Sequence, residues 1–194
     1  MQYLAFGLAS MLALATTGLA QNDVQSHPFQ LVVHSHHHKH NGTALGACHE
    51  GAGIEGLCLG GGSTFHFNTS KNEEATNEFA GKTGVLTYSL VGGNFAESQP
   101  MRLVYNDASN VAVPLFEPSA DYTAVAFDKH NRMNIQSYYD DTVVPVATGT
   151  KAYYRWYVCE TDAGEEYTTL AWVMGEFPPQ NPSCRRVQVI REFV

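Results

Sequence analysis

The sequence is poor in basic residues and, after residue 20, has no long hydrophobic run. Lys and Arg number 11 against 19 Asp and Glu, giving a formal net charge of −8 with histidine neutral. This acidity argues against binding to nucleic acid or to an anionic membrane, because both attract clustered Lys and Arg. No later segment has the roughly 20 apolar residues of a membrane span, and the charged residues 185–194 lack the hydrophobic tail of a lipid anchor. We therefore expect no nucleic-acid partner and no membrane span.

Recognisable catalytic motifs are also missing. No Ser lies in the G-x-S-x-G elbow of the α/β-hydrolases. The segment Gly51–Gly56 matches G-x-G-x-x-G, but it lies between Cys48 and Cys58 with no buried parallel strand directly before it. A tight glycine-rich loop is therefore a better interpretation than a dinucleotide site. Adjacent acidic residues on a strand point to opposite faces, which favours solvated turns over the opposed carboxylates of a glycosidase at Glu73-Glu74, Asp140-Asp141 and Glu165-Glu166.

The N-terminal segment predicts export. An uncharged apolar stretch, Tyr3–Leu14, is followed by Gly18 and Ala20, the small residues that signal peptidase requires at its subsites. We predict a cleaved signal peptide at residues 1–20 and a single mature domain at residues 21–194, which is 194 − 20 = 174 residues. The protein is expected to be secreted, either extracellular or held in a cell wall.

The four cysteines predict disulfides, because an exported chain folds in an oxidising compartment. Three pairings are possible. We favour Cys48–Cys58 and Cys159–Cys184, because each closes a local loop, and each contributes about 3 kcal/mol by the chain-entropy estimate.

Two sequons predict a glycoprotein. Asn41-Gly42-Thr43 and Asn68-Thr69-Ser70 both have a permitted middle residue, and both follow short apolar segments. We expect each Asn to lie in an exposed turn, where a glycan is tolerated.

Alternating hydrophobic residues predict an all-β fold. In Thr64–Asn68 both Phe side chains share one face, and in Val85–Leu90 the larger side chains do. Asp128–Arg132 is the clearest hairpin turn, and only Asn72–Phe79 is compatible with a helix. The pattern indicates a single-domain sandwich or barrel of about ten short strands, with a β-trefoil as the alternative. Further strands are expected at Phe29–Val33, Arg102–Tyr105, Val111–Phe116, Thr123–Asp128, Met133–Tyr139, Val143–Ala147, Tyr153–Cys159, Leu170–Met174 and Val187–Val189.

A histidine-rich run is the most conspicuous local feature. If the strand beginning at Phe29 continues, His34, His36, His38 and His40 project from one face. Neighbours on that face are roughly 6.5 to 7 Å apart. Imidazoles at this spacing converge in pairs on Zn²⁺ or Cu²⁺, the only cofactors that the sequence suggests. The alternative is a solvated polar segment that happens to be rich in histidine.

Aromatic residues concentrate near Cys159, in Tyr153–Tyr157 and at Trp172. One strand face displays either Tyr153 with Tyr157 or Tyr154 with Trp156. An exposed aromatic strip stacks on sugar rings and would bind cell-wall polysaccharide. Packing in the core, against the disulfide, is the more common use of such residues.

Five segments carry a further pattern: Phe29–Val33, Cys48–Ala52, Ile54–Cys58, Thr83–Tyr88 and Val91–Phe95. They resemble a family of small secreted ascomycete proteins of unknown function. The second half is similar, more loosely, to fungal phialide-type cell-wall proteins, in Phe127-Asp128, Asn131–Met133, the strand ending at Cys159, and Asn181–Cys184. The histidine run departs from the Ser/Asn-rich polar loop expected there. The resemblance implies secretion, a β-rich fold and no established activity, and it supplies no catalytic residues.

Together these features predict a non-enzymatic extracellular or cell-wall-associated protein with a surface or interaction role. An extracellular metal or carbohydrate binder is the alternative. A hydrolase of unrecognised type is the third.

Overall fold

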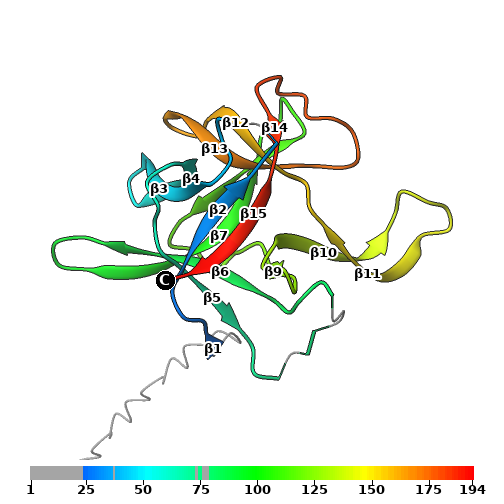
Figure 1. The fold of residues 1–194 in the computed structure, drawn as a ribbon, viewed down its shortest axis with the longest axis horizontal. Helices are drawn as coiled ribbons and strands as arrows, with labels where there is room; N and C mark the ends of the chain where they lie inside the picture. Colours follow the sequence, from blue (N-terminus) through cyan, green and yellow to red (C-terminus); the bar gives the residue numbers. More distant parts are fainter. Residues whose placement is uncertain (1–23, 37, 73, 76–78) are drawn as a thin grey trace, which may run out of the picture.

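The computed structural model of the chain is built from β-strands (Figure 1). It describes residues 24–36, 38–72, 74–75 and 79–194, so the predicted signal peptide lies outside the described residues. No helix in the described part is long and apolar enough to cross a membrane. The strands are β1 (Val24–Gln25), β2 (Phe29–His34), β3 (Thr43–Gly51), β4 (Ile54–Leu59), β5 (Phe65–Thr69), β6 (Thr83–Val91), β7 (Ala96–Tyr105), β8 (Val111–Phe116), β9 (Val125–Phe127), β10 (Met133–Asp140), β11 (Ala147–Tyr153), β12 (Trp156–Asp162), β13 (Glu166–Val173), β14 (Arg185–Arg186) and β15 (Gln188–Phe193).

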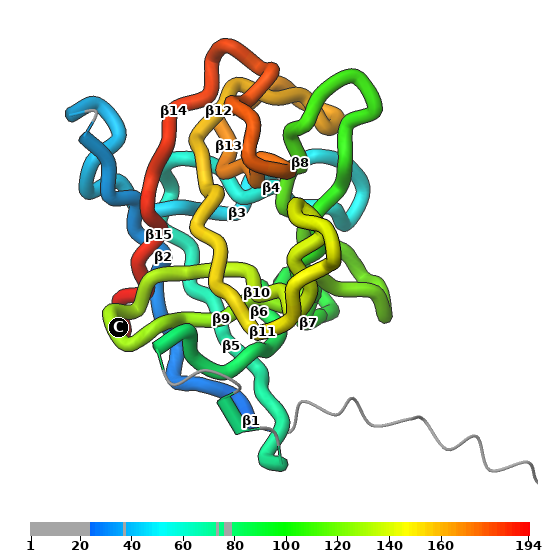
Figure 2. The backbone as a smooth tube through the Cα atoms, turned by 90° about the vertical axis from the view of Figure 1, so that its right-hand side faces the viewer, coloured from blue at the N-terminus to red at the C-terminus, as the bar shows by residue number. Residues whose placement is uncertain are grey.

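Eight of these strands form a closed antiparallel barrel (Figures 1 and 2). They pair in the order β2-β3-β4-β13-β8-β7-β6-β5, and β5 returns to β2 through the pair Phe29 and Phe65. The remaining strands extend this circuit: β9, β10 and β11 continue from β6, β12 and β14 continue from β13, and β15 pairs along β2. The predicted all-β barrel is confirmed, while the sandwich and β-trefoil alternatives are not adopted. The described residues form 15 strands rather than about ten.

Alternating apolar side chains fill the barrel. Phe29, Leu31 and Val33 of β2 are fully buried, as the period-two pattern of a strand with one covered face requires. Trp156 is fully buried too, donates its indole N–H to the carbonyl of Met133 at 2.9 Å, and packs against Trp172. Each such side chain contributes about 1.5–3 kcal/mol of burial free energy. Trp156 is therefore a core residue and does not form part of an exposed aromatic strip.

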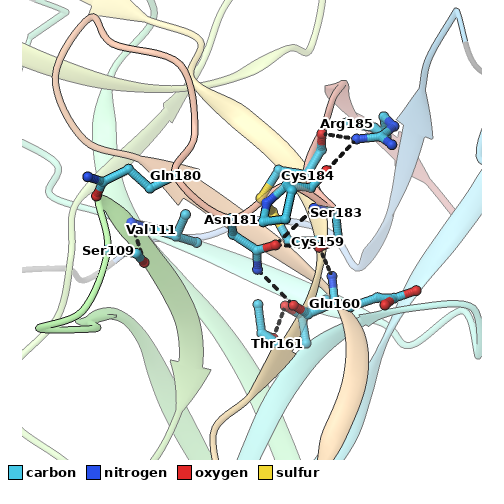
Figure 3. The surroundings of a disulfide bond; sticks show 12 residues. Ser109, Val111, Cys159, Glu160, Thr161, Gln180, Asn181, Ser183, Cys184 and Arg185 are labelled. Atoms are coloured by element: carbon cyan, nitrogen blue, oxygen red, sulfur yellow. Dashed lines mark hydrogen bonds between the residues drawn. A yellow bond between two sulfur atoms is a disulfide. The ribbon is translucent and has the colours of Figure 1, made fainter.

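Both predicted disulfides are present. Cys48–Cys58 joins the neighbouring strands β3 and β4, and Cys159–Cys184 joins β12 to the segment that precedes β14. Figure 3 shows the second bond, where Asn181 donates to the carbonyl of Glu160 and accepts from the Ser183 backbone N–H and hydroxyl. The disulfide and these hydrogen bonds fix the chain just before Arg185.

The glycine-rich segment Gly51–Gly56 contains a tight turn, as predicted, but only Ala52 and Gly53 form it, while Gly51 and Ile54–Gly56 lie on strands. It is the tip of the β3–β4 hairpin, in which Cys48 pairs with Gly56 and Gly51 pairs with Ile54. Glycine is required at Gly56, because a Cβ there would lie 2.7 Å from Glu50 Oε1 and 2.9 Å from Cys48 Sγ. The absence of a side chain lets the buried carboxyl and the disulfide pack against the backbone.

The histidine run does not continue β2, so the prediction of four histidines on one strand face is wrong. The strand ends at His34, and the residues described up to Gly42 form the turn into β3. Asn41 ends the ladder by accepting the Ser35 N–H at 3.0 Å, and Gly42 turns the chain with φ of 75°. Only a residue that tolerates positive φ suits this position.

The strand expected at Val143–Ala147 is not formed as predicted. Residues 143–146 are the exposed tip of the β10–β11 hairpin, where Pro145 has no N–H to offer a neighbouring strand, and Ala147 begins β11. The described residues of Asn72–Phe79, the one segment compatible with a helix, are not helical, and residues 73 and 76–78 lie outside the described part.

Candidate functional site

A pocket of about 630 Å³ lies where four separate parts of the chain meet. Its volume falls in the range of small-molecule sites, about 300–1,000 Å³. The lining is polar and carries positive charge, with Val187 as its one aliphatic residue. The lining residues are His34, Ser35, His36, Asn41, Arg132, Tyr154, Arg186, Val187 and Gln188.

Asp128 holds two of the lining side chains in place. Its Oδ2 accepts from Arg132 Nε at 2.8 Å and from the Tyr154 hydroxyl at 2.9 Å. Its Oδ1 accepts the backbone N–H groups of His130 and Arg132 at 2.8 and 2.9 Å. The Asp128 side chain is only 1% exposed, so this carboxylate is a buried support beneath Arg132 and Tyr154.

The ionisation of Asp128 and Tyr154 follows from these contacts. Burial alone would raise the pKa of Asp128, but hydrogen bonds from the Arg132 backbone, Tyr154, the His130 backbone and the Arg132 side chain outweigh it and lower the pKa. Burial and the hydrogen bond to Asp128 raise the pKa of Tyr154 to about 12. At neutral pH Asp128 is therefore an ionised carboxylate and Tyr154 is a protonated phenol, which donates its hydrogen bond to that carboxylate.

The turn that carries Asp128 and Arg132 is held against the last strand. Asn131 has φ of 59°, which Asn tolerates better than most residues, and it bonds back to the Asp128 carbonyl at 2.8 Å. Arg191 donates to Asn131 Oδ1 at 2.9 Å, and its guanidinium lies 4.4 Å from the ring centre of Phe127. Burial lowers the pKa of Arg191. Arg191 thus holds the Asp128–Arg132 turn against β15, and it does not itself line the pocket.

Arg186 is positioned by the Cys159–Cys184 disulfide. It lies two residues after Cys184 and pairs with Tyr157 in the β12–β14 ladder. Arg186 Nη2 donates to the Tyr154 carbonyl at 3.5 Å, and Val187 N–H donates to the Trp156 carbonyl at 3.0 Å. Figure 3 shows how the preceding Arg185 is turned back onto the carbonyls of Pro182 and Cys184. Adjacent arginines therefore have different roles, and only Arg186 lines the pocket.

A second pocket of about 300 Å³ adjoins the first and shares Arg132 and Tyr154 with it. Lys129 and His130 add further basic groups to its lining. Asp128 is the one carboxylate that lines either pocket in the described chain. Three of the 11 Lys and Arg residues, Lys129, Arg132 and Arg186, therefore gather in a chain whose net charge is −8.

The structure separates the predicted metal ligands. His34 and His36 line the pocket, whereas His38 and His40 do not. Among the described residues, the group whose ligand atoms lie within 4.8 Å of one another is Cys48, Glu50 and Cys58. Its two sulfur atoms are joined in a disulfide, so they offer no thiolate to a metal.

Glu50 is a second unusual carboxyl group. It is 5% exposed, and Oε2 accepts the Glu165 N–H at 3.1 Å while Oε1 has no hydrogen-bond partner among the described residues. Burial raises the pKa of Glu50. The group packs against the Cys48–Cys58 disulfide, does not line either pocket, and supports the β3–β4 hairpin.

The two sequons lie in different surroundings. Asn41 is exposed in the turn before β3, as predicted, and it lies at the rim of the pocket. Asn68 lies on β5 between β1 and β6 instead of in a turn, and its Oδ1 is buried without a partner among the described residues.

Sequence reasoning missed Arg132, Arg186 and Gln188, and it named Tyr154 only as part of a possible aromatic strip. They come from different elements, and only the pairing of β15 with β2 and of β14 with β12 brings them together. One local signal was present: Asp128 begins a turn and is followed at the second and fourth positions by His130 and Arg132. An Asp side chain in such a turn bonds to the backbone ahead of it.

The fold and the pocket define a disulfide-bonded all-β barrel protein with a basic surface pocket. The chain matches a family model described as a domain of unknown function (DUF7907) over residues 26–193, so it belongs to that family. Its sequence shows no match to any curated protein, and its structure shows none to any solved structure.

Proposed function

We propose that this is a non-enzymatic secreted protein, extracellular or cell-wall-associated, that binds a hydrophilic ligand in the pocket of about 630 Å³. The pocket lining is the observation that carries the proposal. Hydrogen-bonding groups from Asn41, Tyr154 and Gln188 stand beside two arginines and two histidines. An apolar ligand would displace water from Gln188 and the two arginines without replacing its hydrogen bonds, which costs about 1–3 kcal/mol for each group left unsatisfied. A saccharide, including the wall polysaccharide suggested by the sequence, has the hydroxyl groups to satisfy them.

The chemistry of Asp128 favours binding over catalysis. A general acid or base must exchange protons with a substrate near the working pH. Asp128 already accepts four hydrogen bonds, and its pKa is lowered further from neutrality. Its role is to hold Arg132 and Tyr154, which supports a binding site rather than an acid–base site.

The two disulfides fit an oxidising compartment, which supports the predicted export. Membership of the DUF7907 family, whose function is unknown, is compatible with a resemblance that assigns no activity. The similarity to ascomycete and phialide-type wall proteins favours a fungal cell wall as the place of action.

Sedimentation with insoluble chitin, β-glucan and pectin tests the proposal. The variant Gln188→Trp places a large side chain in the pocket from an exposed position of β15. Gln25→Trp makes the same substitution at an exposed position of β1 that does not line the pocket. We expect one polysaccharide to deplete the protein and Gln188→Trp alone to prevent this. Equal depletion of both variants would contradict binding through this pocket.

Metal binding is the second candidate, because His34 and His36 line the same pocket. Calorimetric titration with Zn²⁺ and Cu²⁺ should then show a site that is lost in His34→Ala/His36→Ala and kept in His27→Ala. His27 is exposed and lines neither pocket. Equal binding by all three proteins would contradict a metal site here.

A further inference from the structure

We infer that the pocket recognises an oxyanion group, a carboxylate or phosphate, on its ligand, with Arg132 and Arg186 as the binding side chains. This inference rests on the proposed function and names the chemistry of the ligand. The chain has a formal net charge of −8, yet the described residues that line this pocket include two arginines, two histidines and no carboxylate. A charged ligand is attracted to the local field of the site, which here opposes the net charge of the protein.

The Arg132 side chain is ordered by its contacts before any ligand binds. Its Nε is used by Asp128, and its guanidinium lies 4.9 Å from the ring centre of Tyr154. Apart from its contacts with Asp128 and Tyr154, the guanidinium donates no hydrogen bond to a described residue, and the side chain is 36% exposed. The Nη edge of a fixed guanidinium matches the two oxygens of a carboxylate or phosphate. Since the side chain is already ordered, binding costs less conformational entropy.

Arg186 supplies the charge that is not compensated. Within the described chain its side chain forms no ion pair, and its one side-chain hydrogen bond is the long contact to the Tyr154 carbonyl. Its backbone is held by the β12–β14 ladder, beside the Cys159–Cys184 disulfide. The negative charge of Asp128 offsets the positive charge of Arg132, whereas Arg186 forms no ion pair with a described carboxylate. An anion therefore gains its strongest net attraction from Arg186.

Calorimetry on the full mature protein tests the inference with three probes: tri-galacturonate, the neutral trisaccharide maltotriose, and inorganic phosphate. The decisive variants are Arg186→Gln and Arg185→Gln, which remove the same charge from adjacent positions. Arg185 does not line the pocket and donates to the carbonyls of Pro182 and Cys184. A hydrogen bond to a charged group corresponds to about a tenfold to a hundredfold change in affinity.

We expect an anionic probe to bind more tightly than maltotriose and to bind more weakly at high salt. Arg186→Gln should weaken it about tenfold or more and Arg185→Gln less than about twofold. Tri-galacturonate and phosphate separate a saccharide acid from a phosphate ligand.

Three results would overturn the inference. If maltotriose binds as tightly as tri-galacturonate and Gln188→Trp abolishes both, the pocket is a neutral-sugar site, and the proposed function stands without the anion. If Arg185→Gln and Arg186→Gln weaken anion binding equally, the attraction is diffuse and does not come from the pocket. If no probe binds and no polysaccharide depletes the protein, the inference and the proposed function both fall.

Discussion

Replacing Asp128 with Asn perturbs the support of the pocket with almost no change in shape. The amide Oδ1 can still accept the His130 and Arg132 N–H groups. On the other side an NH₂ group would face Arg132 Nε, which also donates, and the Tyr154 hydroxyl would lose its charged acceptor. The substitution therefore removes two charge-assisted hydrogen bonds from a site whose carboxylate is 1% exposed.

The magnitude follows from those two bonds. Hydrogen bonds to charged groups contribute about 1.5–3 kcal/mol each, which gives an upper sum of about 6 kcal/mol. Arg132 is 36% exposed and regains water when its partner is lost, so only part of this sum is realised. We expect a loss of about 3 kcal/mol in the free energy of unfolding, or about 6–12 °C in Tm for a domain of this size.

The loss should depend on pH. The pKa of Asp128 is lower in the folded protein than its ordinary value of 3.8. Its stabilisation is therefore fully present above that value and is lost as pH falls through the lower folded pKa. The difference between the native protein and Asp128→Asn should be constant from neutrality to about pH 5 and shrink below about pH 4.

Chemical denaturation at pH 7, 5 and 3 measures this difference, with Asp121→Asn as the control because Asp121 is exposed and outside the strands. The control should match the native protein within about 0.5 kcal/mol. A loss below about 1 kcal/mol at pH 7, or a loss that is equal at all three pH values, would refute the role assigned to Asp128.

Three further predictions concern other parts of the molecule. Urea denaturation should find Glu50→Gln more stable than the native protein at pH 7 but not at pH 4. Burial raises the pKa of Glu50 above 4.5, so its ionisation at pH 7 opposes folding. A variant that is less stable than the native protein at pH 7 would contradict this. Cys159→Ala/Cys184→Ala should lower the free energy of unfolding by about 3.5 kcal/mol, because it removes a link between residues 25 positions apart. The same variant should bind an anion more weakly, because Arg186 is no longer held in place. Unchanged binding would show that the disulfide does not position Arg186. Mass spectrometry of the protein secreted from a glycosylating host should find a glycan at Asn41 and none at Asn68, since Asn41 is exposed and Asn68 is half-buried between β1 and β6; occupancy of Asn68 alone would contradict this.

The sequence predicted the fold class well because the relevant signals are local. The alternation in β5 and β6, the turn at Asp128–Arg132, and the short loops between paired cysteines each depend on a few adjacent residues. Val111–Phe116 was predicted with the boundaries that the structure shows. Trp156 illustrates the limit, since alternation placed it on one of two faces but the barrel decided that its face is inside.

The β3–β4 hairpin was missed because glycine usually weakens a strand. Here Gly56 is needed for close packing of Glu50 and Cys48, a contact between strands that a local pattern does not reveal. The pocket was missed for a related reason. His34, Arg132, Tyr154 and Arg186 are far apart in the chain, and strand pairing alone brings them to one place.

NMR tests whether Arg132 and Arg186 together bind an anionic ligand in one pocket. Two-dimensional ¹⁵N–¹H spectra resolve the Nε–H signals of arginine side chains, so a titration with tri-galacturonate reports on each arginine separately. We expect the Arg132 and Arg186 signals to shift together and to saturate at one affinity, while the signals of Arg185 and Arg102, which do not line the pocket, stay in place. Equal shifts at Arg185 and Arg186, or no shift at Arg132 and Arg186 while the ligand binds, would contradict it.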